Sequence, residues 1–175
     1  MGSESGLGGQ IAFLRTVPLL RHARLADLEA LAGWASERTY GRGQIIFREG
    51  QPGRELYIVR SGEVIVSQRL RGRVENVIAR FGPREFLGEL GWITGSPRTA
   101  TAQAHCDSTL IHVPGERLFE VIETAPETAC RLLLALAEEF AERISETNQR
   151  LRQAVLWGLD ATGYPDDAVP PGEVT

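Results

Sequence analysis

Short runs of β-branched and aliphatic residues recur through the middle of the chain, at 45–47, 56–59, 64–66, 77–79, 99–104 and 109–113. Turn-forming residues separate several of them, including Gly50-Gln51-Pro52-Gly53 and Ser61-Gly62. Short strands separated by turns at intervals of about ten residues are typical of a jelly roll or a small barrel. The middle of the chain therefore predicts an all-β domain.

Helical spacing flanks this β-rich region on both sides. Residues 11–17 predict a short helix that is interrupted near Pro18. Apolar residues at 25, 28, 31, 32 and 35 predict a second helix over 25–34. After the last strand, Pro114 suits the first turn of a helix that runs to about Glu123. The whole pattern predicts a mainly β fold with flanking helices.

A long helix is predicted from Pro126 to about Trp157, where Gly158 follows. Its apolar stripe falls at positions 129, 133, 136, 140, 144, 151 and 155. Such a helix is longer than the usual 10–14 residues or so of globular proteins, and a small domain can cover only part of its stripe. We therefore expect a homodimer formed through this helix. The alternative is a helix that folds back on its own domain.

Four segments follow from these patterns. We expect a flexible N-terminus over 1–10, a β-rich domain with its N-terminal helices over 11–125, a long C-terminal helix over 126–158 and a loose tail over 159–175. The tail is rich in Pro, Gly and Asp and has no amphipathic pattern.

Composition narrows the classes of function. With 175 residues and 42% hydrophobic content, the chain can form one domain with one appended element. The net charge of −4 argues against broad attraction to DNA or to an anionic membrane. The sequence has no apparent signal peptide and no apolar run of membrane-spanning length. We therefore expect a cytoplasmic protein with no membrane or nucleic-acid partner.

The residues that often carry chemistry are dispersed. Cys106 and Cys130 lack CxxC spacing and are expected to be reduced, mostly buried thiols, with a disulfide as the alternative. His22, His105 and His112 have no spacing that suits a metal or a nucleophilic triad. We expect no metal, no cofactor and no enzymatic activity.

Segment 86–102 contains the residue types that suit a small phosphorylated sugar. Arg98 is planar, permanently charged and suited to a buried phosphate. Gly88 allows the backbone to approach a ligand closely, and a helical turn after it would point free N–H groups at an anion. The carboxylate of Glu89 can accept a hydrogen bond from a ribose hydroxyl. The segment therefore predicts a phosphate-binding site.

This segment resembles the phosphate-binding cassette of the cyclic nucleotide-binding domain family. Gly88-Glu89-Leu90 and Pro97-Arg98-Thr99-Ala100 match the family pattern in order and spacing. Residues 43–50 resemble the family's strand that ends in Glu-Gly, and residues 56–64 resemble its next hairpin. The resemblance covers about residues 11 to 157. It implies an eight-stranded β-roll, or double-stranded jelly roll, followed by a long C-terminal helix.

The resemblance also implies roles for single residues. Arg98 would pair with the cyclic phosphate, and Glu89 would hold the ribose 2′-hydroxyl. The hydroxyl of Thr99 could reach the phosphate or a guanine amino group. The other implied ligand-binding positions of the cassette are Gly88, Leu90, Gly91 and Ala100. Trp92, which follows them, would pack in the core or shape the pocket.

In the family, a residue of the long helix covers the base. The alternatives here are Arg143, Ile144, Thr147 and Asn148. Thr147 interrupts the apolar stripe, so it could hydrogen-bond a purine or, as a polar interface residue, set the register of a helix pair.

The sequence thus favours a regulatory protein that senses cAMP or cGMP and moves its C-terminal helix when the ligand binds. A cyclic dinucleotide remains open as the ligand, and the downstream protein is unknown. The alternatives are a ligand-free structural or dimerisation module, or the sensor domain of a larger transcription factor, channel or enzyme. The 17 residues after Gly158 are too few, and of the wrong composition, to form the helix-turn-helix module of the family's transcription factors.

Overall fold

The computed structural model describes residues 6–70 and 74–162. The elements in chain order are α1 (Leu7–Leu14), the 3-10 helix η1 (Pro18–Leu20), α2 (Leu25–Trp34), β1 (Ser36–Tyr40), β2 (Ile45–Phe47), β3 (Glu55–Ser61), β4 (Val64–Leu70), β5 (Val74–Phe81), β6 (Phe86–Leu87), α3 (Glu89–Thr94), β7 (Thr101–Ala104), β8 (Ser108–Pro114), α4 (Glu116–Thr124) and α5 (Pro126–Thr162). The chain divides after Ala135 into two compact units, and the described residues of the second unit are the later part of α5.

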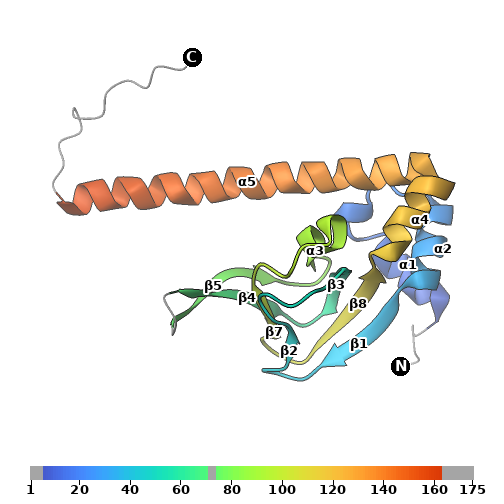
Figure 1. The fold of residues 1–175 in the computed structure, drawn as a ribbon, viewed down its shortest axis with the longest axis horizontal. Coiled ribbons are helices and arrows are strands. Elements are labelled where there is room, and N and C mark those ends of the chain that lie inside the picture. Colours follow the sequence, from blue (N-terminus) through green and yellow to red (C-terminus); the bar gives the residue numbers. More distant parts are fainter. Residues whose placement is uncertain (1–5, 71–73, 163–175) are drawn as a thin grey trace, which may run out of the picture. The chain divides into compact units, whose positions relative to one another are not determined.

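The strands form two four-stranded antiparallel sheets, ordered β1-β8-β3-β6 and β2-β7-β4-β5. One cluster of buried side chains draws on both sheets, with Tyr57 and Leu110 from the first and Val64 and Ala102 from the second. Figure 1 shows α1, α2 and α4 gathered at one end of the strands. The predicted eight-stranded roll with a long C-terminal helix is confirmed.

Two strands have no counterpart in the predicted pattern. β1 is polar, and all of its residues except Tyr40 are exposed, so it lacks the alternation that marks a half-buried strand. Its pairing with β8, from Ser36 opposite His112 to Tyr40 opposite Ser108, holds it in place. β6 has only two residues, Phe86 and Leu87, which pair with β3. Both strands depend on partners distant in the sequence.

Several element boundaries differ from the predicted ones. α1 begins at Leu7, so residues 7–10 are helical rather than part of a flexible N-terminus. Pro114 is the last residue of β8, opposite Glu55, and α4 begins two residues later. Proline has no N–H to donate to a sheet ladder, and Pro114 lies where the β3–β8 ladder ends.

The long helix does not end before Gly158, as predicted, but continues to Thr162. A glycine inside a helix costs only about 1 kcal/mol relative to alanine. The residues expected to form the loose tail therefore begin within α5, and residues 163–175 lie outside the described part of the chain.

Both cysteines are free and exposed, which corrects the prediction of buried thiols. Cys106 lies in the turn between β7 and β8. Cys130 follows the buried Ala129 on α5, and the helical rotation of 100° per residue turns it away from the packed face.

Candidate functional site

A cavity of about 220 Å³ lies in the roll, next to α3. Every predicted site residue of segment 88–100 lines it: Gly88, Glu89, Leu90, Gly91, Arg98, Thr99 and Ala100. Strand side chains complete the wall, namely Phe47, Val66, Ile78, Ala79, Phe81 and Leu87. The cavity thus combines a mostly apolar wall with one buried cation, and all of its residues belong to the first compact unit.

Arg98 is the cation of this cavity and is only 4% exposed. Its Nη1 donates to the carbonyl oxygen of Gly88 and its Nη2 to that of Glu55, both at 2.9 Å. The Phe47 ring centroid lies 4.5 Å from the guanidinium carbon. Within the described residues, the hydrogen-bond partners of the guanidinium are all neutral. A buried charge is expensive without an opposite charge, so the site favours an anion.

Two glycines make room for this arginine. Gly88 adopts φ +84°, and a Cβ there would lie 2.7 Å from Nη1 of Arg98. Gly53 packs against the other side, where a Cβ would lie 2.5 Å from Nε. The sequence associated Gly88 with close approach to a ligand, whereas the structure shows that it approaches the arginine itself.

The cassette helix α3 starts directly after Gly88. Glu89, at its first position, is half-buried, while the next residue, Leu90, is 47% exposed. Trp92 is buried and is not among the residues that line the described cavity, which favours its predicted role in the core. The first N–H groups of a helix lack acceptors within that helix, so this end of α3 favours negative charge.

The three residues after Pro97 alternate in burial. Arg98 and Ala100 are buried and Thr99 is exposed, although its backbone carbonyl accepts a hydrogen bond from Nε2 of Gln68 at 2.9 Å. Ala100 also belongs to the hydrophobic core cluster. The alternation buries the arginine and leaves Thr99 at the rim of the cavity that both residues line.

Behind Arg98 lies a group of polar side chains that the sequence did not single out. The Tyr57 hydroxyl accepts from Nη2 of Arg98 at 3.5 Å and donates to Oε2 of Glu55 at 2.8 Å. Nδ1 of His112 lies 3.7 Å from the same carboxylate oxygen, and its Nε2 lies 3.0 Å from the Tyr40 hydroxyl. Phe47 and Tyr57 occur in the two blocks that resemble the family, but their pattern indicated only core strands.

Burial dominates the acid–base behaviour of this group. It raises the pKa of Tyr57, and the hydrogen bond to Glu55 raises it further. Burial lowers the pKa of His112, against the opposing effect of the Glu55 carboxylate. Both side chains are therefore neutral near pH 7.

The predicted base-capping residues, Arg143 and Thr147, lie on α5 in the second compact unit. The Thr147 hydroxyl donates to the backbone carbonyl of Arg143 at 2.8 Å; Thr147 is exposed and Arg143 is half-buried. Their contact with a base remains a prediction.

The described residues show neither a metal centre nor a membrane-spanning helix. They contain no group of three or more His, Cys, Asp or Glu side chains that could hold a metal ion. Among the helices of residues 6–70 and 74–162, none is long and apolar enough to cross a membrane.

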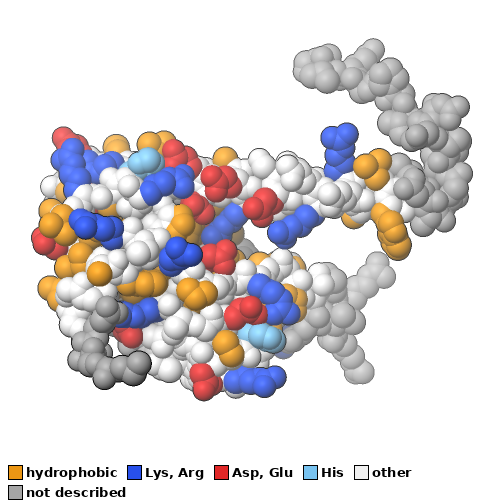
Figure 2. All heavy atoms as spheres, turned by 180° about the vertical axis from the view of Figure 1, so that it is seen from behind, with side chains coloured by type: hydrophobic (Ala, Val, Ile, Leu, Met, Phe, Trp, Pro, Cys, Tyr) orange, Lys and Arg blue, Asp and Glu red, His pale blue; other side chains and the backbone are white. Residues whose placement is uncertain are grey.

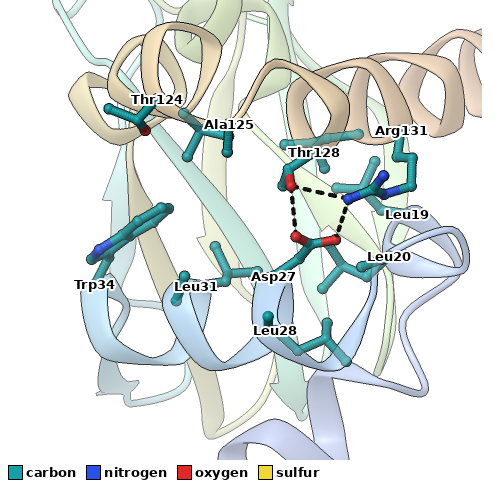
Figure 3. Close-up of a pocket in the computed structure, with 15 residues that line it drawn as sticks. Leu19, Leu20, Asp27, Leu28, Leu31, Trp34, Thr124, Ala125, Thr128 and Arg131 are labelled. Carbon is teal, nitrogen blue, oxygen red and sulfur yellow. Dashed lines mark hydrogen bonds and ion pairs between the residues drawn. The ribbon is translucent and has the colours of Figure 1, made fainter.

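A second cavity, of about 310 Å³, lies among α2, α4 and the start of α5. Figure 3 shows Asp27 pointing toward Thr128 and Arg131, with Leu31 and Trp34 along the wall. Thr128 donates to Oδ1 of Asp27 at 2.6 Å, and Nη2 of Arg131 donates to Oδ2 at 3.0 Å. Most of the other residues that line the cavity are apolar, including Leu19, Leu28 and Leu132.

Comparison with known proteins agrees with the geometry. Residues 37–125 match the family model of the cyclic nucleotide-binding domain. A CRP-like cAMP-activated global transcriptional regulator of Mycobacterium tuberculosis is 32% identical over 117 residues, which are 67% of this chain and 50% of that protein. The chain therefore spans about half the length of this curated relative.

Two further similarities bear on the context of the domain. The crystal structure of the N-terminal domain of a transcriptional regulator from Streptomyces coelicolor is 34% identical, with a TM-score of 0.66 over 79% of this chain and 94% of that one. An uncharacterized NTE family protein of Mycobacterium tuberculosis is 28% identical over 93% of this chain and 30% of its own length. Similar domains thus occur within longer proteins of different kinds.

Proposed function

The chain belongs to the cyclic nucleotide-binding domain family, and from this premise we propose that its cavity binds cAMP or cGMP with the cyclic phosphate on Arg98. The observation that carries the proposal is the buried guanidinium of Arg98, whose partners in the described structure are neutral. A cyclic phosphate supplies one negative charge and two acceptor oxygens. It would replace the missing counter-charge without bringing bulk water into the cavity.

The remaining contacts follow the order of the cassette. Glu89 lies at the start of α3, on the cavity wall, where its carboxylate can accept from the ribose 2′-hydroxyl. The backbone of Leu90 and Gly91 would face the phosphate, and Thr99 would donate its hydroxyl to the phosphate or to a guanine. Ile78 and Phe81 provide apolar wall on which a flat base can rest.

We propose that a change in the position of α5 transmits ligand binding to a downstream protein. Arg143 or Thr147 would cover the base, so that contacts made only in one position of the helix would shift its equilibrium when ligand binds. Apolar side chains at Ile144, Leu151 and Val155 are more than half exposed. Figure 2 shows hydrophobic side chains at the surface of this helix toward its far end. A second copy of the chain would cover this stripe in a homodimer.

The proposed role is regulatory, because the family match and the curated regulator describe ligand-responsive domains. The alternatives, a ligand-free dimerisation module or the sensor part of a larger protein, differ in what the pocket does. The first predicts no nucleotide binding at all. The second predicts the same binding with an additional activity elsewhere in a longer chain.

The test is isothermal titration of the purified chain with cAMP and then cGMP, beside Arg98→Ala. Removing charge-assisted hydrogen bonds of about 1.5–3 kcal/mol each should weaken binding by roughly tenfold to several hundredfold. Arg15→Ala, at an exposed position just after α1, is the matched control and should bind like the parent. Absence of heat with both nucleotides, in folded protein free of bound nucleotide, would instead favour the ligand-free module.

A further inference from the structure

We propose that Tyr57 and Glu55 are positioning residues for Arg98: the carboxylate of Glu55 orients the Tyr57 hydroxyl, and that hydroxyl holds one edge of the guanidinium. The inference rests on the proposed function for its ligand, the cyclic phosphate. It adds two residues of β3, outside the cassette, to the determinants of phosphate affinity.

Two oxygens of β3 share Nη2 of Arg98. This nitrogen of Arg98 donates to the Glu55 backbone carbonyl at 2.9 Å and approaches the Tyr57 oxygen at 3.5 Å. Nη1 donates to Gly88, on the other edge of the cassette turn. Three oxygens from two segments thus fix the plane of the guanidinium before any ligand is present. A pre-fixed plane lowers the entropy cost of a directional contact with phosphate.

The Glu55 carboxylate sets the direction of the Tyr57 hydroxyl. Its proton goes to Oε2 of Glu55 at 2.8 Å, so its oxygen lone pairs are left to face Arg98. Without the carboxylate, the hydroxyl could rotate and offer its proton to the guanidinium side, where it would repel rather than hold Nη2. The Glu55 side chain therefore acts on Arg98 only through the Tyr57 hydroxyl.

The Tyr57 hydroxyl also separates the Glu55 carboxylate from the Arg98 charge. A carboxylate in direct contact with Arg98 would compete with the phosphate for the guanidinium. Glu55 is 39% exposed at its side chain, and the hydroxyl lies between it and Arg98. The arrangement orients the cation while leaving its charge available to a ligand.

The ring of Tyr57 has a separate, structural role. It lies 5.2 Å from the guanidinium carbon, packs on Phe47, and meets His112 edge-on at 4.7 Å. Tyr57→Phe keeps these ring contacts and removes only the oxygen, so it isolates the positioning effect. Tyr40→Phe is the matched control, because it removes a buried hydroxyl of the same core that bonds His112 rather than Arg98.

The experiment is a double-mutant cycle on cyclic nucleotide affinity, measured by titration of the full chain. Tyr57→Phe and Glu55→Ala should each weaken binding roughly two- to tenfold. The double variant should lose no more than Tyr57→Phe alone, because both changes remove one contact. Glu55→Gln keeps an acceptor for the hydroxyl and should retain most of the affinity. Tyr40→Phe should lower thermal stability without changing affinity.

A second measurement on ligand-free protein separates this inference from the proposed function. The side-chain N–H signals of Arg98, assigned by their loss in Arg98→Lys, should be protected from solvent exchange in the parent and lose protection in Tyr57→Phe and Glu55→Ala. Protection without nucleotide binding would refute the proposed ligand but keep the positioning pair. Unchanged affinity and protection in Tyr57→Phe, or additive losses in the cycle, would overturn the pair.

Discussion

Arg98 can be buried because its neighbour Gly53 has no side chain. A Cβ at Gly53 would lie 2.5 Å from Nε and 2.9 Å from the guanidinium carbon, closer than real side chains pack. The guanidinium is the far end of a flexible side chain, so it would move rather than break the fold. Gly53 therefore governs where the charge lies more than whether the roll forms.

We expect Gly53→Ala to weaken cyclic nucleotide binding at least tenfold while shifting the midpoint of thermal unfolding only slightly. The displaced guanidinium would lose its hydrogen bonds to the carbonyls of Gly88 and Glu55. Titration and thermal melts of the same samples measure both quantities. Gly33→Ala, on α2 with open space around its Cβ, is the control. Equal binding by both variants would show that Gly53 is not a constraint on the site.

The sequence could predict the contiguous part of the site and missed the rest for a physical reason. Residues 88–100 lie in one segment, so their order and spacing are enough to predict a phosphate-binding site. Glu55 and Tyr57 reach Arg98 across 43 and 41 residues of chain, and only strand pairing brings them there. A hydrophobic pattern also cannot distinguish Tyr57 from any other buried aromatic residue of a strand, because the pattern does not report the hydrogen bonds of its hydroxyl.

At the level of elements, a polar network around Asp27 joins α2 to the start of α5. Asp27 accepts from Thr128, from Arg131 and from the backbone N–H of Arg24. Burial alone would raise the pKa of Asp27, but these three hydrogen bonds and the nearby Arg131 charge outweigh it and lower the pKa. The folded state therefore favours the ionised carboxylate.

Asp27→Asn should lower the free energy of unfolding at pH 7 by about 1–3 kcal/mol, because a buried acceptor becomes a donor among donors. A group with a lowered folded pKa contributes stability above its unfolded pKa, near 3.8, and loses it as pH falls through the folded value. The difference between parent and variant should thus shrink near pH 3. Denaturant unfolding at both pH values measures this. Glu29→Gln, exposed on the same helix, should show no such difference.

The elements themselves were largely predictable, since hydrophobic runs and turn residues mark most strands, and α2 matches its predicted bounds of 25–34. β1 escaped prediction because its residues are polar and its stability comes from β8. The end of α5 was predicted too early. Gly158 weakens the helix but does not end it, because a glycine inside a helix costs only about 1 kcal/mol.

For the molecule as a whole, buried His112 links folding to pH. Its lowered pKa means that the unfolded chain takes up a proton near pH 6.5 while the folded protein stays neutral. Stability should therefore be highest above pH 6.5 and fall as pH drops toward the folded pKa, by up to about 1.4 kcal/mol per pH unit.

Urea unfolding of the parent and of His112→Gln between pH 7.5 and 5.5 tests this link. The variant starts less stable, since it loses the contacts with Tyr40 and Tyr57, but its stability should depend less steeply on pH. His22→Gln, which changes an exposed histidine, should keep the parent's slope. A parent whose stability is flat over this range would refute the assignment.

The proposed homodimer is also a property of the whole molecule. Leu151, which is 61% exposed, lies on the apolar stripe of α5, and Gln149 lies about 200° around the helix from it. We expect light scattering to give the mass of two chains for the parent and for Gln149→Glu, and of one chain for Leu151→Glu. A monomeric parent would reject dimerisation through this helix.

The position of β8 between β1 and β3 has a consequence for synthesis on the ribosome. β1 ends at Tyr40, yet its partner strand begins at Ser108, so most of the domain is made before the first sheet can close. Until then, β1 and β3 each present an unpaired backbone edge, which is a template for contact between chains. Nascent chains that stall before residue 108 should therefore be the form most in need of chaperones, whatever the stability of the finished protein.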